Sequence, residues 1–310
     1  MKIQKNINLA PYTTFRIGGM AKEFAIVKSV EELAEALQYA KGNNLKYYIL
    51  GGGSNVLFDD RGFDGLVIRI ESASYIKIEG EKLECWAGES LASVLNLARD
   101  NDLSGLENLA GIPGTIGGAV RGNAGAFGTA MANLVSKVKF LDAASGKIKE
   151  IGKDDCGFSY RNSIFKENPD LIIISVVLGL RTGKKEEIEK AMRETIRKRN
   201  EKQPQGWFGC AGSFFENPVV EKKELIERFE RDTGAKSREN KIPAGWLIRE
   251  TGLSGKKIGG VELNEKHSNF IINNGEGTAE EVIMLSSIIK QKVRTELGVQ
   301  LREEVQYVGY

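Results

Sequence analysis

Two glycine-rich segments in the first half of the chain have the composition of a nucleotide-binding site. The first of them, Gly51-Gly52-Gly53-Ser54-Asn55, follows a short apolar run. Consecutive glycines allow amide N–H groups to converge on an anion, and the Ser and Asn side chains add further donors. The segment matches neither the Rossmann fingerprint nor the P-loop, so a diphosphate cradle and a tight structural turn are both open interpretations.

The second glycine-rich segment, residues 105–128, is longer and carries only two charged side chains. Eight of its 24 residues are glycine. Ordering so much flexible backbone costs conformational entropy, so the segment must pack against something. Glycine clusters mark close approach of the backbone to a neighbour, which favours a loop that wraps a flat cofactor. A glycine-rich core crossover is the alternative.

Several polar side chains outside these segments could act on a substrate. Arg161 could clamp a carboxylate with its planar guanidinium, although an ordinary surface arginine is the alternative. Ser213 could donate a proton, although most serines after a glycine are simple turn residues. His267 is the only histidine and no GxSxG motif is present, so a Ser–His–Asp hydrolase is a poor fit. Glu303 and Glu304 fall on opposite faces of a predicted strand, so one of them could point inward, although two solvated acids are the alternative.

The elements that must hold these residues follow an α/β pattern. Capping boxes at Ser29/Glu32 and Thr278/Glu281 mark two helix starts, and Gly298 ends the second helix. The patterns predict helices over residues 29–42, 91–101, 184–202, 221–232, 243–251 and 278–297. They predict strands or hairpins over residues 47–50, 66–70, 75–87, 137–151, 171–180, 262–273 and 299–308.

A shift in composition after Gly183 suggests a domain boundary near residue 184. The charged segment 184–202 has Ile188, Met192 and Ile196 on one stripe, which indicates an amphipathic helix joining two domains. The C-terminal strand is expected to return to the first domain, because a lone strand needs a sheet to join.

Composition excludes several classes of protein. The chain has 44 Lys and Arg against 42 Asp and Glu, so its net charge of +2 gives no reason to expect binding to nucleic acid or anionic lipid. Three distant cysteines and one histidine argue against a disulfide scaffold or a metal site. The longest apolar run, residues 171–180, is too short to cross a membrane, and the first residues lack a signal peptide. These features predict a reduced, cytoplasmic protein.

Taken together, the motifs resemble those of the UDP-N-acetylenolpyruvoylglucosamine reductase family over nearly the whole chain. Each motif alone is weak, but their order is highly specific. The motifs are TTFRIGG at 13–19, GGGSN at 51–55, GIPGTIGGA at 111–119, NAGAFG at 123–128, SYRNSIF at 159–165, AGSFFENP at 211–218, AGWLIRETGLSGKKIGG at 244–260, KHSNFIIN at 266–273 and LREEVQYVG at 301–309.

The resemblance implies an α+β fold with an FAD-binding domain of the vanillyl-alcohol-oxidase type in two subdomains, followed by a C-terminal α/β substrate-binding domain. The expected divisions are 1–70 for the first subdomain, 71–184 for the second, joined by the tail 299–310, and 185–298 for the substrate domain. The stretch 202–297 is too short for the insertion of type I members, so the chain resembles the type II form.

FAD is the cofactor that the resemblance implies. Its diphosphate would lie near the first glycine-rich segment, at Gly51, Gly52, Gly53, Ser54 and Asn55. Its flavin ring would be held by the second, at Gly111, Ile112, Pro113, Gly114, Gly117, Gly118 and Ala119. The predicted flavin domain has no histidine, so noncovalent FAD is expected, with Cys85 and Cys156 as formal exceptions.

The implied reaction uses NADPH to reduce FAD, after which UDP-N-acetylglucosamine-enolpyruvate accepts hydride at C3 and a proton at C2, giving UDP-N-acetylmuramate. The resemblance assigns Arg161 as charge stabiliser, Ser213 as proton donor and Glu304 as acidic partner. The family tail reads Leu-Glu-Pro-Glu-Val, and this chain departs from it, so Glu303 remains a rival to Glu304. The expected substrate contacts are Tyr160, Asn217 and His267.

Two other functions remain as alternatives. One is an oxidase or dehydrogenase of the same fold with another substrate, and the other is a catalytically silent nucleotide-binding module. The presence of all three candidate catalytic residues disfavours both. No metal, nucleic acid, membrane or obligate protein partner is expected.

Overall fold

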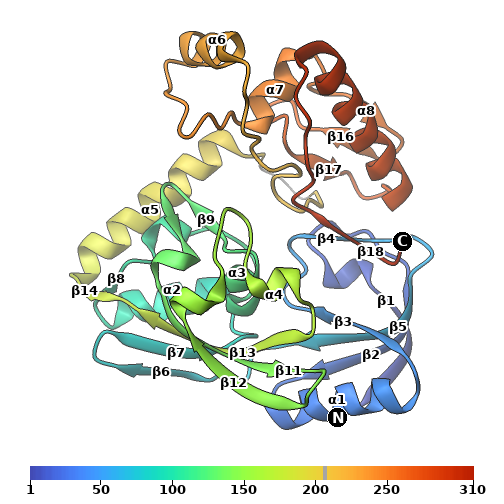
Figure 1. The fold of residues 1–310 in the computed structure, drawn as a ribbon, viewed down its shortest axis with the longest axis vertical. Coiled ribbons are helices and arrows are strands. Elements are labelled where there is room, and N and C mark those ends of the chain that lie inside the picture. Colours follow the sequence, from blue (N-terminus) through green and yellow to red (C-terminus); the bar gives the residue numbers. More distant parts are fainter. Residues whose placement is uncertain (205–207) are drawn as a thin grey trace. The chain divides into compact units, whose positions relative to one another are not determined.

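The computed structural model describes residues 1–204 and 208–310 (Figure 1). Its contacts divide the chain into two compact units. The first unit comprises residues 1–7, 21–52 and 64–201, and the second comprises residues 8–20, 53–63 and 202–310. The predicted boundary near residue 184 precedes helix α5 (Lys185–Lys202), whereas these contacts group nearly all of α5 with the first unit.

The first unit is built on two sheets, one with strand order β1-β2-β5-β3 and one with strand order β12-β11-β13-β7-β6. A few of its elements extend by one residue into the second unit. Besides α5, its elements are β1 Ile3–Asn8, β2 Met20–Val27, α1 Val30–Gly42, β3 Lys46–Leu50, β5 Phe63–Ile70, β6 Ile76–Glu79, β7 Lys82–Trp86, α2 Leu91–Asp100, β8 Leu103–Ser104, α3 Ile116–Arg121, β9 Gly125–Ala126, β10 Thr129–Ala130, β11 Val135–Asp142, β12 Lys147–Gly152, α4 Ile164–Glu167, β13 Leu171–Gly179 and β14 Arg181–Thr182.

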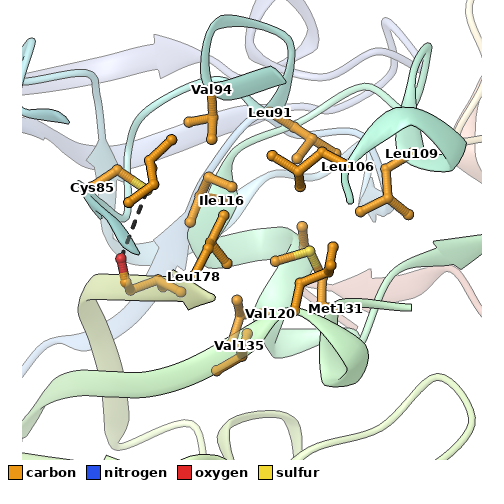
Figure 2. Packing of buried hydrophobic residues seen from close by; sticks show 14 of the residues in the cluster. Cys85, Leu91, Val94, Leu106, Leu109, Ile116, Val120, Met131, Val135 and Leu178 are labelled. Carbon is orange, nitrogen blue, oxygen red and sulfur yellow. Dashed lines mark hydrogen bonds between the residues drawn. The ribbon is translucent and has the colours of Figure 1, made fainter. Parts of the chain in front are cut away.

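Strand β13 lies in the middle of the five-stranded sheet and is buried on both faces. Ile172 and Ile174 pack in a cluster with α1, β2 and β5. Val176 and Leu178 pack in another cluster that holds side chains of α2 and α3, where Figure 2 shows Leu178 close to Ile116. Burial on both faces explains why the sequence of β13 is a continuous apolar run without alternation.

The second unit has a small three-stranded sheet, β15-β16-β17, and a parallel pair of β4 with β18. Its long helix α8 begins as predicted: the Thr278 side chain accepts from the Glu281 amide, and the Glu281 carboxylate accepts from the Thr278 amide. Gly298 ends the helix in the left-handed conformation. The elements are β4 Val56–Phe58, α6 Lys223–Thr233, α7 Ala244–Glu250, β15 Lys257–Ile258, β16 Val261–Leu263, β17 Ile271–Asn273, α8 Ala279–Leu297 and β18 Gln306–Val308.

The structure corrects the prediction for the C-terminal tail. Only Gln306–Val308 of the predicted strand 299–308 is extended in a ladder, and it pairs in parallel with β4. The tail therefore returns to the predicted flavin domain, as expected, but it joins residues 56–58 of the predicted first subdomain and not the range 71–184. Its earlier residues pair by isolated contacts with another segment of the second unit, which no local pattern in the tail could indicate.

Two further predictions need adjustment. Residues 105–128 are not one continuous loop, because they contain α3, whose N-cap Thr115 accepts from the Gly118 amide. The buried stripe of α5 is formed by Ile188, Met192 and Thr195, whereas Ile196 is 41% exposed. None of the helices in the described residues combines the length and apolar composition needed to cross a membrane.

Candidate functional site

The two glycine-rich segments meet in the first unit. A Cβ atom added to Gly51 would lie 2.7 Å from Thr115 Oγ1, and one added to Gly52 would lie 2.7 Å from Gly114 Cα. Real Cβ atoms do not approach other atoms so closely. The backbones of the two segments therefore pack directly against each other, which only glycine permits at these positions.

A cleft of about 460 Å³ opens beside this contact. Ser90, the N-cap of α2, lines it together with Ser93, and the two hydroxyls lie 2.7 Å apart. Lys28 and Arg69 also line the cleft, together with the carboxylates of Glu71 and Glu89. A helix N-terminus, hydroxyl donors and glycine backbone are suited to a diphosphate. The lining residues are Lys28, Gly51, Gly52, Arg69, Ile70, Glu71, Ser72, Gly88, Glu89, Ser90, Ser93, Gly114 and Thr115.

No sequence motif indicated the residues that this cleft takes from outside the glycine-rich segments. Ser90 directly precedes the predicted helix over residues 91–101, and Lys28 and Arg69 belong to no motif. Lys28 and Arg69 both form ion pairs with Glu71, at 3.6 and 3.4 Å. Glu89 accepts hydrogen bonds from the Ser72 hydroxyl and two main-chain amides, so its carboxylate supports the cleft wall.

The remaining residues of the first glycine-rich segment, Gly53, Ser54 and Asn55, belong to the second unit. Gly53 and Asn55 make structural contacts there. Gly53 has a φ of +65°, and a Cβ on it would lie 2.1 Å from the Tyr12 carbonyl oxygen. Asn55 donates through Nδ2 to the Glu304 carbonyl, at 3.0 Å. Both residues are thus explained without a ligand, and their contact with FAD, like that of Ser54, stays a prediction.

Of the residues predicted to hold the flavin, some are packed against the protein interior and others have open space beside them. Gly117 donates to the Ala87 carbonyl at 2.9 Å, and a Cβ there would lie 2.9 Å from Ala87 Cβ, so it packs on the sheet. Ala119 is also buried. Gly118 has open space, with only Thr115 Oγ1 at 3.4 Å from an added Cβ. Gly111 has a φ of +80°, which only glycine adopts readily. Flavin contact at Ile112 and Pro113 stays a prediction.

Arg161 lies at a strained turn of the first unit. Its φ is +56°, an uncommon conformation for a residue with a side chain. Main-chain hydrogen bonds between Ser159 and Asn162 close the turn, and Lys166 Nζ donates to the Arg161 carbonyl at 2.8 Å. The guanidinium carbon lies 5.2 Å from the centre of the Tyr160 ring. The turn thus sets the direction of the arginine side chain.

Asn123 ties this turn to the second glycine-rich segment. Its Nδ2 donates to the Ser159 carbonyl at 2.7 Å, and its Oδ1 accepts from the Ala132 amide at 2.9 Å. Asn123 is itself buried, with a φ of +42°. A buried asparagine that satisfies two separate chain segments is a positioning residue. It stands in the NAGAFG motif, but nothing local indicated its role.

In the second unit, the segment that follows Ser213 pairs with the segment that contains Glu304. The Glu304 amide donates to the Phe214 carbonyl at 2.9 Å, and the Glu216 amide donates to the Arg302 carbonyl at 3.0 Å. Phe215 and Glu303 form an antiparallel bridge. Two candidate catalytic residues that are far apart in the sequence therefore lie on neighbouring segments.

The two neighbouring glutamates differ in their surroundings. Glu303 forms an ion pair with Lys290 of α8, with 2.5 Å between carboxylate and ammonium. That ion pair directs the Glu303 carboxylate to α8. The assignment of the acidic role to Glu304 remains a prediction, and this difference supports it.

The two remaining predicted substrate contacts of the second unit have visible partners. Asn217 Oδ1 accepts from the Ala244 amide at 3.0 Å, which caps the first turn of α7. His267 packs edge-on against Phe270, and its Nδ1 lies 3.4 Å from the Asn269 amide. Burial lowers the pKa of His267, and the charge of Lys202 adds to the effect, so the ring is neutral at neutral pH.

The cysteines are unsuited to covalent attachment of a flavin. Burial raises the pKa of Cys85 to about 12 and that of Cys156 to about 11. Cys85 lies in the cluster of Figure 2, with Sγ 3.9 Å from the Val176 carbonyl. Since the thiolate is the reactive form, both side chains are poor nucleophiles. The burial of both thiols supports noncovalent binding of FAD.

Comparisons with known proteins agree with the motifs. The family model described as "UDP-N-acetylenolpyruvoylglucosamine reductase, C-terminal domain" matches residues 203–308, and one described as "FAD binding domain" matches residues 21–152. UDP-N-acetylenolpyruvoylglucosamine reductase of Solibacter usitatus is 37% identical over 310 residues, covering 100% of this chain and 97% of that protein. The enzyme of the same name from Caldanaerobacter subterraneus is 36% identical, and the match covers 99% of this chain and 94% of that protein.

A solved structure is similar over the whole length. The crystal structure of UDP-N-acetylenolpyruvylglucosamine reductase (MurB) from Thermus caldophilus superimposes with a TM-score of 0.78 at 32% identity, covering 99% of both chains. These matches confirm the predicted fold class, an FAD-binding domain followed by a C-terminal domain, and FAD as the cofactor. The chain belongs to the UDP-N-acetylenolpyruvoylglucosamine reductase family.

Proposed function

We propose that this chain reduces the enolpyruvyl group of UDP-N-acetylglucosamine-enolpyruvate to give UDP-N-acetylmuramate, with NADPH as the reductant. Family membership supports the substrate and the reaction. The observation that carries the proposal within the structure is the pairing of the Phe214 segment with the Glu304 segment. This pairing places the backbone of a hydroxyl donor beside the backbone of a carboxyl group, which is consistent with the two side chains acting on one substrate.

The cleft of the first unit is suited to the diphosphate of FAD. Gly51, Gly52 and Gly114 leave their backbone accessible, and Ser90 and Ser93 offer hydroxyls. When bound, FAD supplies the hydride that is transferred to C3 of the enolpyruvyl group. The open face at Gly118 supports the proposal that residues 111–119 contact the flavin.

Three side chains carry the rest of the proposed chemistry. Ser213 donates a proton from Oγ to C2 of the substrate. Arg161 offers its planar guanidinium to the substrate carboxylate, where negative charge builds up during the reaction. Glu304 stabilises the same reacting group as its acidic partner. Phe214 and Phe215, which follow Ser213, are buried and anchor its segment in the core of the second unit.

The proposed surroundings of the enzyme follow from charge and chemistry. A net charge of +2 offers no general attraction for nucleic acid or membrane, and the family's nucleotide-sugar substrate supports a cytoplasmic site of action. No obligate protein partner is needed for the proposed reaction.

The test separates the two half-reactions without oxygen. NADPH should bleach the flavin absorbance near 450 nm, and one equivalent of UDP-N-acetylglucosamine-enolpyruvate should restore it. If oxygen restores the absorbance but the enolpyruvyl substrate does not, the chain is an oxidase of the same fold and the proposal is wrong. A colourless protein with no affinity for FAD would contradict both flavoenzyme functions. Of the functions considered, only a catalytically silent nucleotide-binding module would then remain.

A further inference from the structure

One cation of the first unit has no part in the proposed reaction. Arg199 lies near the end of α5 and reaches the second glycine-rich segment. A Cβ added to Gly111 would lie 3.1 Å from Arg199 Cδ. The Arg199 guanidinium carbon lies 5.5 Å from the centre of the Phe127 ring, whose side chain is 45% exposed. The arginine is therefore held between two parts of residues 111–128.

Two of the three nitrogen atoms of this guanidinium are buried and unused. Arg199 Nε and Nη2 have no hydrogen-bond partner within the part of the chain that the structure describes. Arginine is charged at any ordinary pH, and a buried donor on a charged group is costly when it is left unsatisfied. A side chain as long as arginine normally extends to water to avoid that cost.

Its neighbours on α5 behave differently. Arg197 pairs with Glu201, and Lys198 pairs with Glu194 at 2.9 Å. Acidic side chains are thus available along the helix, but Arg199 points away from them and toward Gly111 and Phe127. Its orientation is not explained by helix electrostatics.

A second positive charge, that of Arg161, acts on the Arg199 side chain. Burial lowers the pKa of Arg199, and the positive charge of Arg161 lowers it further. Two like charges placed together in a partly buried location destabilise the folded chain unless an anion joins them. Each guanidinium also has a neighbouring aromatic ring, Tyr160 for Arg161 and Phe127 for Arg199. Such a ring can stack on one face of the planar guanidinium and leave the N–H groups at its edge free to bind an oxyanion.

We propose that Arg199 is an anion-binding residue that, next to Arg161, takes a carboxylate or phosphate oxyanion of a molecule bound beside residues 111–128. This inference deepens the proposed function and rests on it for the identity of that molecule. The two sources in the proposed reaction are the enolpyruvyl carboxylate of the substrate and the phosphates of NADPH. Both present oxygens that a guanidinium binds bidentately.

The test compares Arg199→Met with Arg197→Met in the FAD-loaded protein. Methionine keeps the apolar stem and removes the charge and the donors, and Arg197 is an exposed position on the same helix. Anaerobic rapid mixing gives the Kd of NADPH in flavin reduction and the Kd of UDP-N-acetylglucosamine-enolpyruvate in reoxidation. Loss of charge-assisted hydrogen bonds should raise at least one of these Kd values by about 10- to 100-fold in Arg199→Met only.

The outcomes separate the two sources. A rise confined to the enolpyruvyl substrate assigns the carboxylate, one confined to NADPH assigns the phosphates, and a rise in both assigns a shared site. Both Kd values unchanged within about twofold in folded Arg199→Met would overturn the proposal. Arg199→Lys serves as a second variant, since it keeps the charge but lacks the planar fork and should recover only part of the affinity.

A measurement that needs no turnover tests the anion site even if the proposed reaction fails. Inorganic diphosphate should raise the Tm of the FAD-loaded wild-type protein and of Arg197→Met, but raise that of Arg199→Met much less. Equal shifts in all three proteins would overturn the anion site. A wild-type protein that responds to diphosphate but not to the enolpyruvyl substrate would overturn the proposed function alone.

Discussion

In the first unit the cleft lies beside a close main-chain contact between two glycine-rich segments, whereas in the second unit the candidate groups are side chains on two paired segments. Gly51 and Gly52 meet Gly114 and Thr115 with no room for a Cβ atom. Ser213 and Glu304 instead project from segments held together by main-chain hydrogen bonds at Phe214 and Glu216. The main-chain contact cannot tolerate added atoms, while the paired segments can lose a side chain and keep their pairing.

This difference between main-chain contact and projecting side chains predicts different effects of substitutions in the two units. Adding a side chain in the first unit should remove the cofactor and loosen the fold together. Removing a side chain in the second unit should leave the cofactor and fold in place and affect only the chemistry. The following variants test this contrast, from the largest expected effect to the smallest.

Gly52→Val should have the largest effect. Its Cβ would lie 2.7 Å from Gly114 Cα, a main-chain atom that cannot move aside cheaply. We expect loss of bound FAD and a fall in the free energy of unfolding of about 1–3 kcal/mol, as for other overpacked sites. Flavin absorbance per protein and the thermal unfolding midpoint measure both effects. Gly42→Ala is the control, because nothing lies within 4 Å of its added Cβ. A fully yellow Gly52→Val protein would contradict the contrast.

Ser213→Ala should leave FAD binding and reduction by NADPH unchanged. Reoxidation by the enolpyruvyl substrate should slow by about 10²- to 10⁴-fold, the usual contribution of a positioned proton donor. The main-chain hydrogen bonds that hold the segment at Phe214 do not involve the hydroxyl, so the fold should persist. Rapid mixing of each half-reaction gives the two rates. An equal fall in both would mean that Ser213 is structural.

Glu304→Gln and Glu303→Gln form a matched pair on adjacent residues. Glu304→Gln should slow reoxidation by about 10²-fold if its carboxyl group stabilises the reacting group. Glu303→Gln should leave that rate within about twofold and lose about 1 kcal/mol of stability, because it weakens a partly buried ion pair with Lys290. The reverse ranking of the two rates would assign the acidic role to Glu303.

The lowered pKa of His267 predicts a small effect of pH on the stability of the second unit. Its folded pKa is lowered by burial and by Lys202, so below about pH 6.5 the unfolded chain takes up the proton first. The contribution of His267 is therefore present above that pH and is lost as the pH falls. His267→Gln should flatten the decline of Tm between about pH 7 and pH 5. An unchanged slope would show that other groups set the acid limit.

Local patterns predicted the elements better than their partners. The capping box at Thr278 and Glu281 and the apolar run of β13 each matched the structure, because caps and burial are local properties of a segment. The tail was assigned to the wrong subdomain of the predicted flavin domain, because it pairs with β4 at residues 56–58 and not with the range 71–184. Such contacts depend on loop closure across the whole chain and have no local pattern.

The same distinction applies to the site. The sequence was enough to identify two glycine-rich segments, and the resemblance carried by its motifs implied the family and its flavin-binding fold. Tertiary structure was needed to place Gly52 against Gly114, to direct Glu303 to Lys290 and to bury the donors of Arg199. Glycine content and capping are encoded in neighbouring residues, whereas steric contact, ion pairing and desolvation depend on which distant atoms the fold brings together.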